Sequence, residues 1–190
     1  MQVSAPFYAR CREEWRDHLS KIYHREREVW LVFPSKASGE ESVSYNDAVE
    51  EALCFGWIDG QAGTLDASHG VRRFTPRRKG SAYSRPNIER LLWLEGQGML
   101  IPEVQEQVHE LIHSPFVYPQ DIMEAMQEDP VVWENYQRFS ESYKRIRIAY
   151  IDGARKRPKE FGKRLHSFIQ KTREGKIITG YGGIEKYYLQ

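Results

Sequence analysis

The chain has 190 residues, of which 40% are hydrophobic, and 28 Lys and Arg nearly balance 27 Asp and Glu. A chain of this length can bury a core without help from metals or disulfides. Its formal net charge of +1 argues against a global electrostatic attraction to nucleic acid or to a membrane surface.

The number of cysteines and the composition of the N-terminal segment indicate the cellular compartment in which we expect the protein. Two cysteines, Cys11 and Cys54, are too few for a disulfide framework, so we expect reduced thiols in an intracellular protein. The N-terminal segment lacks the apolar stretch of a signal peptide, and no run of about 18 apolar residues marks a membrane span. We therefore expect a cytoplasmic location and no membrane span.

The first elements predicted along the chain are two helices separated by a strand. Apolar residues spaced by three or four positions predict a helix over residues 9–23. A β-branched and aromatic run predicts a strand over residues 28–33. Ser44 followed by Asp47 is typical of a helix N-cap, and the apolar pattern after it predicts a helix over residues 45–53.

A hairpin and a further helix follow. Residues 57–65 and 70–75 read as two paired strands, and glycines within or beside them indicate bulges or close backbone approaches, at Gly56, Gly60 and Gly63. Pro86 is a favourable first residue for a helix, which we expect to stop at Gly96 and Gly98. The strands predict a small antiparallel sheet.

The rest of the chain reads as helical. Pro102 opens an amphipathic helix that ends at Ser114 and Pro115, and four more helices are predicted over residues 119–128, 130–139, 140–156 and 158–173. Three tyrosines in the C-terminal tail predict that the tail docks on the protein. We predict an α+β fold, with an α+β subdomain over residues 1–114 and a helical subdomain over residues 115–190.

Charge is unevenly distributed in the C-terminal half. Residues 101–135 contain eight acidic residues and no Lys or Arg, whereas residues 136–176 contain thirteen basic residues and four acidic ones. The basic segment could offer a face to nucleic acid or another acidic partner. Alternatively, the two segments are neighbouring helices that neutralise each other, which is the ordinary state of a solvated helical surface.

One short motif suggests metal chemistry. His109, Glu110 and His113 fit the H-E-x-x-H pattern, in which two histidines one helical turn apart hold zinc and the glutamate is a general base. The helical period places both histidines on the polar side, away from the apolar stripe through Val108. Glu134 is the third ligand that spacing allows. A metal-dependent hydrolase is therefore an alternative to a plain surface helix.

Cys54 is a poor candidate nucleophile. The helical period places it opposite the apolar stripe and near Glu50 and Glu51, whose charges would raise the pKa of a thiol. We expect a partly buried structural thiol. Glycine-rich nucleotide loops and the nucleophile elbow of hydrolases are also missing from the sequence.

The stretch from residue 72 to residue 87 has a composition suited to an anion. It combines six cationic residues with serines, an asparagine and two aromatic side chains, and it runs from a strand through a loop into a helix. Guanidinium groups, hydroxyls and free helix amides bind phosphate or carboxylate. The structural alternative is a charged loop whose arginines pair with Asp59, Glu50 or Glu51.

Several segments carry a family resemblance, namely residues 51–60 (EALCFGWIDG), 73–78 (RFTPRR), 80–81, Ser84, 87–90 (NIER) and 143–157 (YKRIRIAYIDGARKR). Together they resemble the YdeI/OmpD-associated proteins, also described as bacteriocin-protection proteins. Tyr83 stands where that family usually carries tryptophan. The resemblance implies a role in stress or bacteriocin resistance, implies no catalytic mechanism, and does not require the His109 and His113 pair.

We expect an uncharacterised member of this family that binds a small anionic ligand, or a protein partner. The site residues we predict are Trp57, Asp59, Arg73, Arg77, Ser81, Tyr83, Ser84 and Asn87. Arginines would clamp the anion, hydroxyls and the amide would orient it, and the two aromatic rings would wall the site. We assign no catalytic residue, no metal ligand and no cofactor, and we do not expect nucleic acid as a partner.

Overall fold

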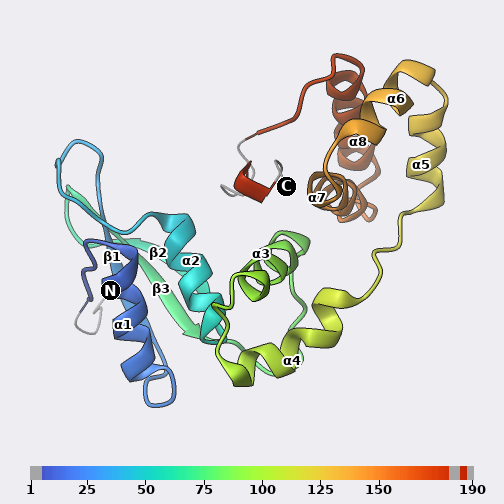
Figure 1. Cartoon of the computed structure of the whole chain (residues 1–190). Coiled ribbons are helices and arrows are strands. Elements are labelled where there is room, and N and C mark those ends of the chain that lie inside the picture. The colour runs from blue at the N-terminus through green and yellow to red at the C-terminus, as the bar shows by residue number, and fades with distance from the viewer. Residues whose placement is uncertain (1–5, 180–184, 188–190) are drawn as a thin grey trace. The chain divides into compact units, whose positions relative to one another are not determined.

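Three antiparallel strands and two helices in the first half of the chain, followed by a series of further helices, give the α+β fold that periodicity predicts (Figure 1). The structure is a computed structural model and describes residues 6–179 and 185–187. The chain divides into two units, one of residues 1–82 and 91–109, the other of residues 83–90 and 110–190. The subdomain boundary between residues 114 and 115 stays a prediction.

The sheet of the first unit has the order β1-β3-β2, with strands β1 (Val29–Pro34), β2 (Trp57–Thr64) and β3 (His69–Pro76). The register shifts between Asp59 and Ala62, so a bulge lies at Gly60 and Gln61, where the glycine predicted one. β3 is the central strand because both neighbours pair with it. The sequence predicts the strands, but the central place of β3 depends on contacts between distant segments.

The outer edge of β1 is occupied by the N-terminal segment. The amide of Phe7 donates to the carbonyl of Trp30 at 2.7 Å, and the amide of Val32 donates to the carbonyl of Phe7 at 2.8 Å. Beside this bridge, Tyr8 packs against a buried apolar cluster of Trp30, Val32 and Val71. A short stretch of chain therefore satisfies backbone groups that an edge strand would otherwise expose.

Two helices, α1 (Arg12–Ile22) and α2 (Tyr45–Cys54), accompany the sheet (Figure 1). The ring of Trp15 lies 5.3 Å from that of Phe74 on β3, and its indole N–H donates to the carbonyl of Ala48 at 3.0 Å. Ser44 caps α2 as predicted, since its hydroxyl accepts from the amide of Asp47 at 3.1 Å. The apolar stripes of both helices thus meet one face of the sheet.

Charged residues of α2 are inside the core, which the helical pattern did not predict. Glu50 and Glu51 are completely buried, and their partners come from α1 rather than from the arginines of residues 72–78. Arg12 binds Glu51 at 2.5 Å and Glu50 at 2.9 Å, while Arg16 binds Glu51 at 2.6 Å. The structural alternative for the cationic stretch is therefore wrong for these two glutamates, but it is right for Asp59, which lies 3.8 Å from the guanidinium of Arg72.

Helices α3 (Arg85–Gly96) and α4 (Pro102–His113) are joined by a short turn. The amide of Met99 donates to the carbonyl of Leu94 at 3.0 Å and that of Gly98 to the carbonyl of Glu95 at 2.9 Å, with Gly98 at φ +65°. This pattern is a Schellman motif, in which glycine adopts the left-handed conformation without a Cβ clash. The glycine stop expected after α3 is confirmed at Gly98.

The second unit is mainly helical. It contains α5 (Gln120–Gln127), α6 (Pro130–Arg138), α7 (Glu141–Asp152), α8 (Pro158–Arg173) and the short 3-10 helix η1 (Glu185–Tyr187). α6 packs on α5 and α8, and α7 packs on α8. No helix in the described part of the chain is long and apolar enough to cross a membrane. In the predicted docking tail, Tyr187 is buried, whereas Tyr181 and Tyr188 lie outside the described residues.

Candidate functional site

The two faces of β3 carry different chemistry. The guanidinium of Arg72 lies 5.0 Å from the ring of Tyr45 on α2, and Phe74 packs on Trp15 of α1, so both side chains point toward the helices. Side chains alternate along a strand, so Arg73 and Thr75 lie on the opposite face. That second face offers the cationic and hydroxyl groups that the sequence suggested for an anion.

An open hollow of about 410 Å³ lies on this face, and we call it the basic groove. Its lining contains four arginines and two hydroxyl residues, namely Arg27, Ile58, Arg73, Thr75, Pro76, Arg77, Arg78 and Ser81. None of these lining residues is acidic. The groove thus concentrates positive charge in a chain whose overall charge is almost zero.

The four arginines of the basic groove differ in how they are held. Arg73 binds the carboxylate of Glu28 at 2.5 Å, so an anion would share this guanidinium with Glu28. Arg77 donates to the backbone carbonyls of Ser81 and Ala82 and thereby braces the loop that follows β3. Arg27 and Arg78 are exposed. Within the described part of the chain, residues 6–179 and 185–187, neither of them forms an ion pair.

The loop that carries Arg78 and Ser81 is itself a turn. Both the amide and the hydroxyl of Ser81 donate to the carbonyl of Arg78, and Gly80 between them has φ +78°. The amide of Arg77 donates to the carbonyl of Gly56 at 2.9 Å, which ties the start of the loop to the turn between α2 and β2. The loop is therefore fixed at both ends, and this limits the entropy that ligand binding would cost.

Of the predicted site residues, Arg73, Arg77 and Ser81 line the basic groove, but Trp57 and Asp59 do not. Trp57 is only 1% exposed, and its indole N–H donates to the carbonyl of Tyr23 at 3.3 Å. Asp59 accepts a hydrogen bond of 2.5 Å from the hydroxyl of Tyr45 on α2. These two side chains serve the packing of sheet on helix.

The remaining three predicted residues belong to the second unit, at the start of α3. Tyr83 and Ser84 precede the helix, and the backbone carbonyl of Ser84 accepts from the amide of Ile88 at 3.0 Å. The side-chain oxygen of Asn87 accepts from Arg90 at 3.0 Å. None of the three lines the basic groove.

Arg27 is a groove residue that the sequence did not single out. It lies about fifty positions before Arg78 and reaches the groove because β1, which begins two residues later, pairs with β3. A sequence signal existed in the cluster of charged residues at 24–28, HRERE, directly before a predicted strand. Strand order was needed to connect that cluster with residues 73–78.

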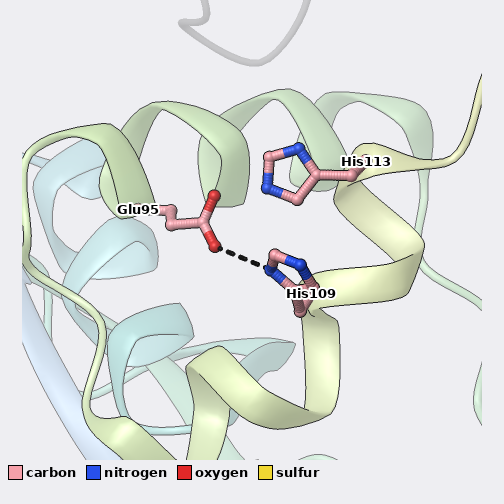
Figure 2. Close-up of side chains that lie close together, drawn as sticks. All are labelled: Glu95, His109 and His113. Atoms are coloured by element: carbon pink, nitrogen blue, oxygen red, sulfur yellow. Dashed lines mark hydrogen bonds and ion pairs between the residues drawn. The ribbon is translucent and has the colours of Figure 1, made fainter.

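The two histidines of α4 are exposed as predicted, but a different carboxylate accompanies them. Figure 2 shows the carboxylate of Glu95, at the end of α3, directed toward His109 and His113. One Oε of Glu95 lies 3.5 Å from Nδ1 of His109, and one nitrogen or oxygen from each of the three side chains lies within 4.8 Å of the others. Glu134, the ligand suggested by spacing, instead binds Arg138 at 2.5 Å on α6.

The acidic and basic segments of the C-terminal half bind each other. Arg155 binds Asp121 at 2.8 Å, and Arg173 binds Asp129 at 2.8 Å, so helices from the two segments are joined by ion pairs. Arg145 binds Glu89 at 2.7 Å, and Arg164 binds Glu160 at 2.8 Å. The pairs of Arg155 with Asp121 and of Arg173 with Asp129 fit the interpretation of mutual neutralisation. Nucleic-acid binding through residues 136–176 was an alternative that we did not favour, and it stays untested.

Both cysteines are free, with Cys11 exposed and Cys54 buried. Burial, followed by the charge of neighbouring Glu51, raises the pKa of the Cys54 thiol to about 12. The thiol is therefore protonated at neutral pH, and burial also keeps thiol reagents away from it. Cys54 is thus a structural thiol rather than a nucleophile.

We expect iodoacetamide to label the folded protein at Cys11 and to leave Cys54 unmodified, with both thiols labelled after denaturation. Intact mass measurement gives the number of labels, and Cys11→Ser should remove native labelling while Cys54→Ala should not. Two labels on the folded protein would contradict the described burial of Cys54.

Two family models match two separate parts of the chain. Residues 7–107, just over half of the chain, match the family described as Domain of unknown function (DUF8412), and this range contains the basic groove. Residues 115–175 match the family described as Bacteriocin-protection, YdeI or OmpD-Associated (OmdA).

The second match confirms the resemblance seen in the sequence and includes residues 143–157, whereas residues 51–90 fall within the first match. No curated protein and no solved structure matches the chain significantly. The chain belongs to the DUF8412 family, and its helical C-terminal part matches the YdeI/OmpD-associated bacteriocin-protection family.

Proposed function

We propose that the protein binds a small anion, carrying a phosphate or carboxylate group, in the basic groove. The observation that carries this proposal is the meeting of Arg27, Arg73, Arg77 and Arg78 around an open hollow on one face of the sheet. The hydroxyls of Thr75 and Ser81 lie in the same lining and supply neutral donors. Guanidinium groups bind such anions through paired, charge-assisted hydrogen bonds.

The local charge supports binding rather than internal pairing. Four guanidinium groups line the groove, and Glu28 is a carboxylate next to them that engages one of the four, Arg73. Like charges held close together repel one another, and a bound anion relieves that repulsion. Arg27 and Arg78 can turn toward the ligand at little cost because they are exposed.

The test uses inorganic phosphate as the probe and the double variant Arg27→Ala/Arg78→Ala. Thermal unfolding and calorimetric titration should show that phosphate binds and stabilises the wild type, and that the double variant binds roughly tenfold or more weakly. Sulfate and acetate at equal ionic strength, compared with chloride, separate a preference for phosphate from one for carboxylate.

The matched control is Arg25→Ala/Lys79→Ala. It removes the same charge from exposed positions two residues and one residue away from the tested arginines, and neither position lines the groove. Phosphate affinity should stay within a factor of about two of the wild-type value if the groove is the site. Equal weakening in the two double variants, or no phosphate binding at all, would show that the groove is not an anion site.

The name of the matched C-terminal family, which describes bacteriocin protection, supports a proposal about the cellular role. We propose that anion binding contributes to such protection and that the protein acts in the cytoplasm. A strain lacking the protein should become more sensitive to a bacteriocin, and the wild-type chain should restore resistance better than Arg27→Ala/Arg78→Ala. If both chains restore resistance equally, anion binding in the basic groove does not contribute to protection.

A further inference from the structure

We propose that Glu95, His109 and His113 form a binding site for a divalent transition metal, with Zn²⁺ as the ion best suited to it (Figure 2). Two imidazoles and one carboxylate are a ligand set that zinc accepts, and it leaves a fourth position for water or another ligand. This site shares no residue with the basic groove, so each proposal can fail without the other.

The histidines are presented by a helix that is anchored on its other side. His109 and His113 are four positions apart, and such residues lie one above the other on the same helix face. The opposite stripe, Val104, Val108 and Ile112, is at most 4% exposed. The apolar residues thus fix the rotation of α4, and both imidazoles stay on its solvent side.

The distances fit a metal that draws three side chains together. Two ligands bound at about 2.1 Å to a tetrahedral ion are about 3.4 Å apart. The distance from Glu95 Oε1 to His109 Nδ1 is 3.5 Å, close to that value. The upper limit of 4.8 Å among all three groups leaves only a small side-chain rotation to complete the site.

Glu95 is positioned by the turn between the helices. Its backbone carbonyl accepts from the amide of Gly98 in the Schellman motif, and its side chain is 14% exposed, against 64% for His109. The carboxylate is therefore confined before any metal binds, which lowers the entropy cost of binding. An exposed histidine pair without this carboxylate would offer only two ligands.

The H-E-x-x-H pattern would make Glu110 the general base of a hydrolase, but the structure groups Glu95 with the histidines instead. Among the described residues, Glu110 supplies no atom to the cluster. We therefore infer metal binding with an open coordination position and do not infer peptide hydrolysis. The side chain of His109 is 64% exposed, so solvent reaches this cluster.

The experiment uses the full chain without a histidine tag, treated with chelator and then titrated with ZnCl₂ by calorimetry. One equivalent of Zn²⁺ should bind to the wild type, and Co²⁺ should produce the visible absorption of a low-symmetry, four- or five-coordinate ion. Glu95→Gln and His113→Gln should each weaken Zn²⁺ binding by at least about tenfold, since even outer contacts to a metal are worth that much.

The matched control is His69→Gln, because His69 also lies between carboxylates, 2.8 Å from Asp66 and 3.1 Å from Glu40. This variant should bind Zn²⁺ like the wild type, and circular dichroism of each metal-free variant shows whether it is folded. The proposal is overturned if the wild type binds no stoichiometric zinc, if Glu95→Gln and His113→Gln bind it unchanged, or if His69→Gln loses it.

Discussion

Replacing Arg12 by methionine is expected to lower the free energy of unfolding of the first unit by about 3–5 kcal/mol. Arg12 is the shared partner of Glu50 and Glu51, both completely buried, and it also binds Asp47 at 2.8 Å. Methionine keeps most of the side-chain volume but removes the charge. Glu50 then loses its ion pair with Arg12, and Glu51 keeps its ion pair with Arg16.

Urea unfolding followed by tryptophan fluorescence measures this loss, since four of the five tryptophans lie in the first unit. The control is Arg10→Met, because Arg10 is two positions away, its side chain is 68% exposed, and it pairs at the surface with Glu14, four positions along the chain. Arg10→Met should leave the unfolding midpoint nearly unchanged. Similar shifts for the two variants would mean that the buried pairs contribute no more than a surface pair.

In the second unit, Glu89→Gln is expected to cost about 3–5 kcal/mol of unfolding free energy. Glu89 is 3% exposed and binds two arginines, Arg85 at 2.5 Å and Arg145 at 2.7 Å. The amide of glutamine has nearly the same shape but no negative charge. Two largely buried guanidinium groups would then face each other without a counter-charge, and their repulsion adds to the cost of desolvation.

Far-UV circular dichroism during urea unfolding follows this change because the second unit is mainly helical. Glu134→Gln is the matched control, since Glu134 also binds an arginine, Arg138, but its side chain is 65% exposed. Its unfolding midpoint should stay close to that of the wild type. If Arg145→Met combined with Glu89→Gln is no more stable than Glu89→Gln alone, charge repulsion is not the source of the loss.

Much of the secondary structure could be predicted because its signals are local. The cap at Ser44, the hairpin over residues 57–76 and the glycine stop after α3 are specified by residues close together in the chain. Burial of Glu50 and Glu51 could not be predicted in the same way. Their charged side chains would normally lie on the solvent face of a helix, but arginines from α1, 35 to 39 positions earlier in the chain, neutralise them in the core.

The candidate site could also be predicted only where its residues lie close together in the chain. Arg73, Arg77 and Ser81 lie within nine residues, and the strand and turn that carry them bring them to one groove. Arg27 joins through the pairing of β1 with β3, which no local pattern specifies. Trp57 resembled a binding residue because aromatic and cationic side chains were dense in that block, yet its ring fills the core.

The short bridge at Phe7 has a consequence for how the protein behaves at high concentration. Phe7 and Tyr8 cover the outer edge of β1 and the Trp30, Val32 and Val71 cluster. A chain trimmed past Tyr8 would leave open backbone donors and acceptors next to uncovered apolar side chains, a combination that recruits strands from other molecules. Phe7 and Tyr8 thus protect the protein against self-association. Removing them would favour aggregation even where both proposed binding sites stay intact.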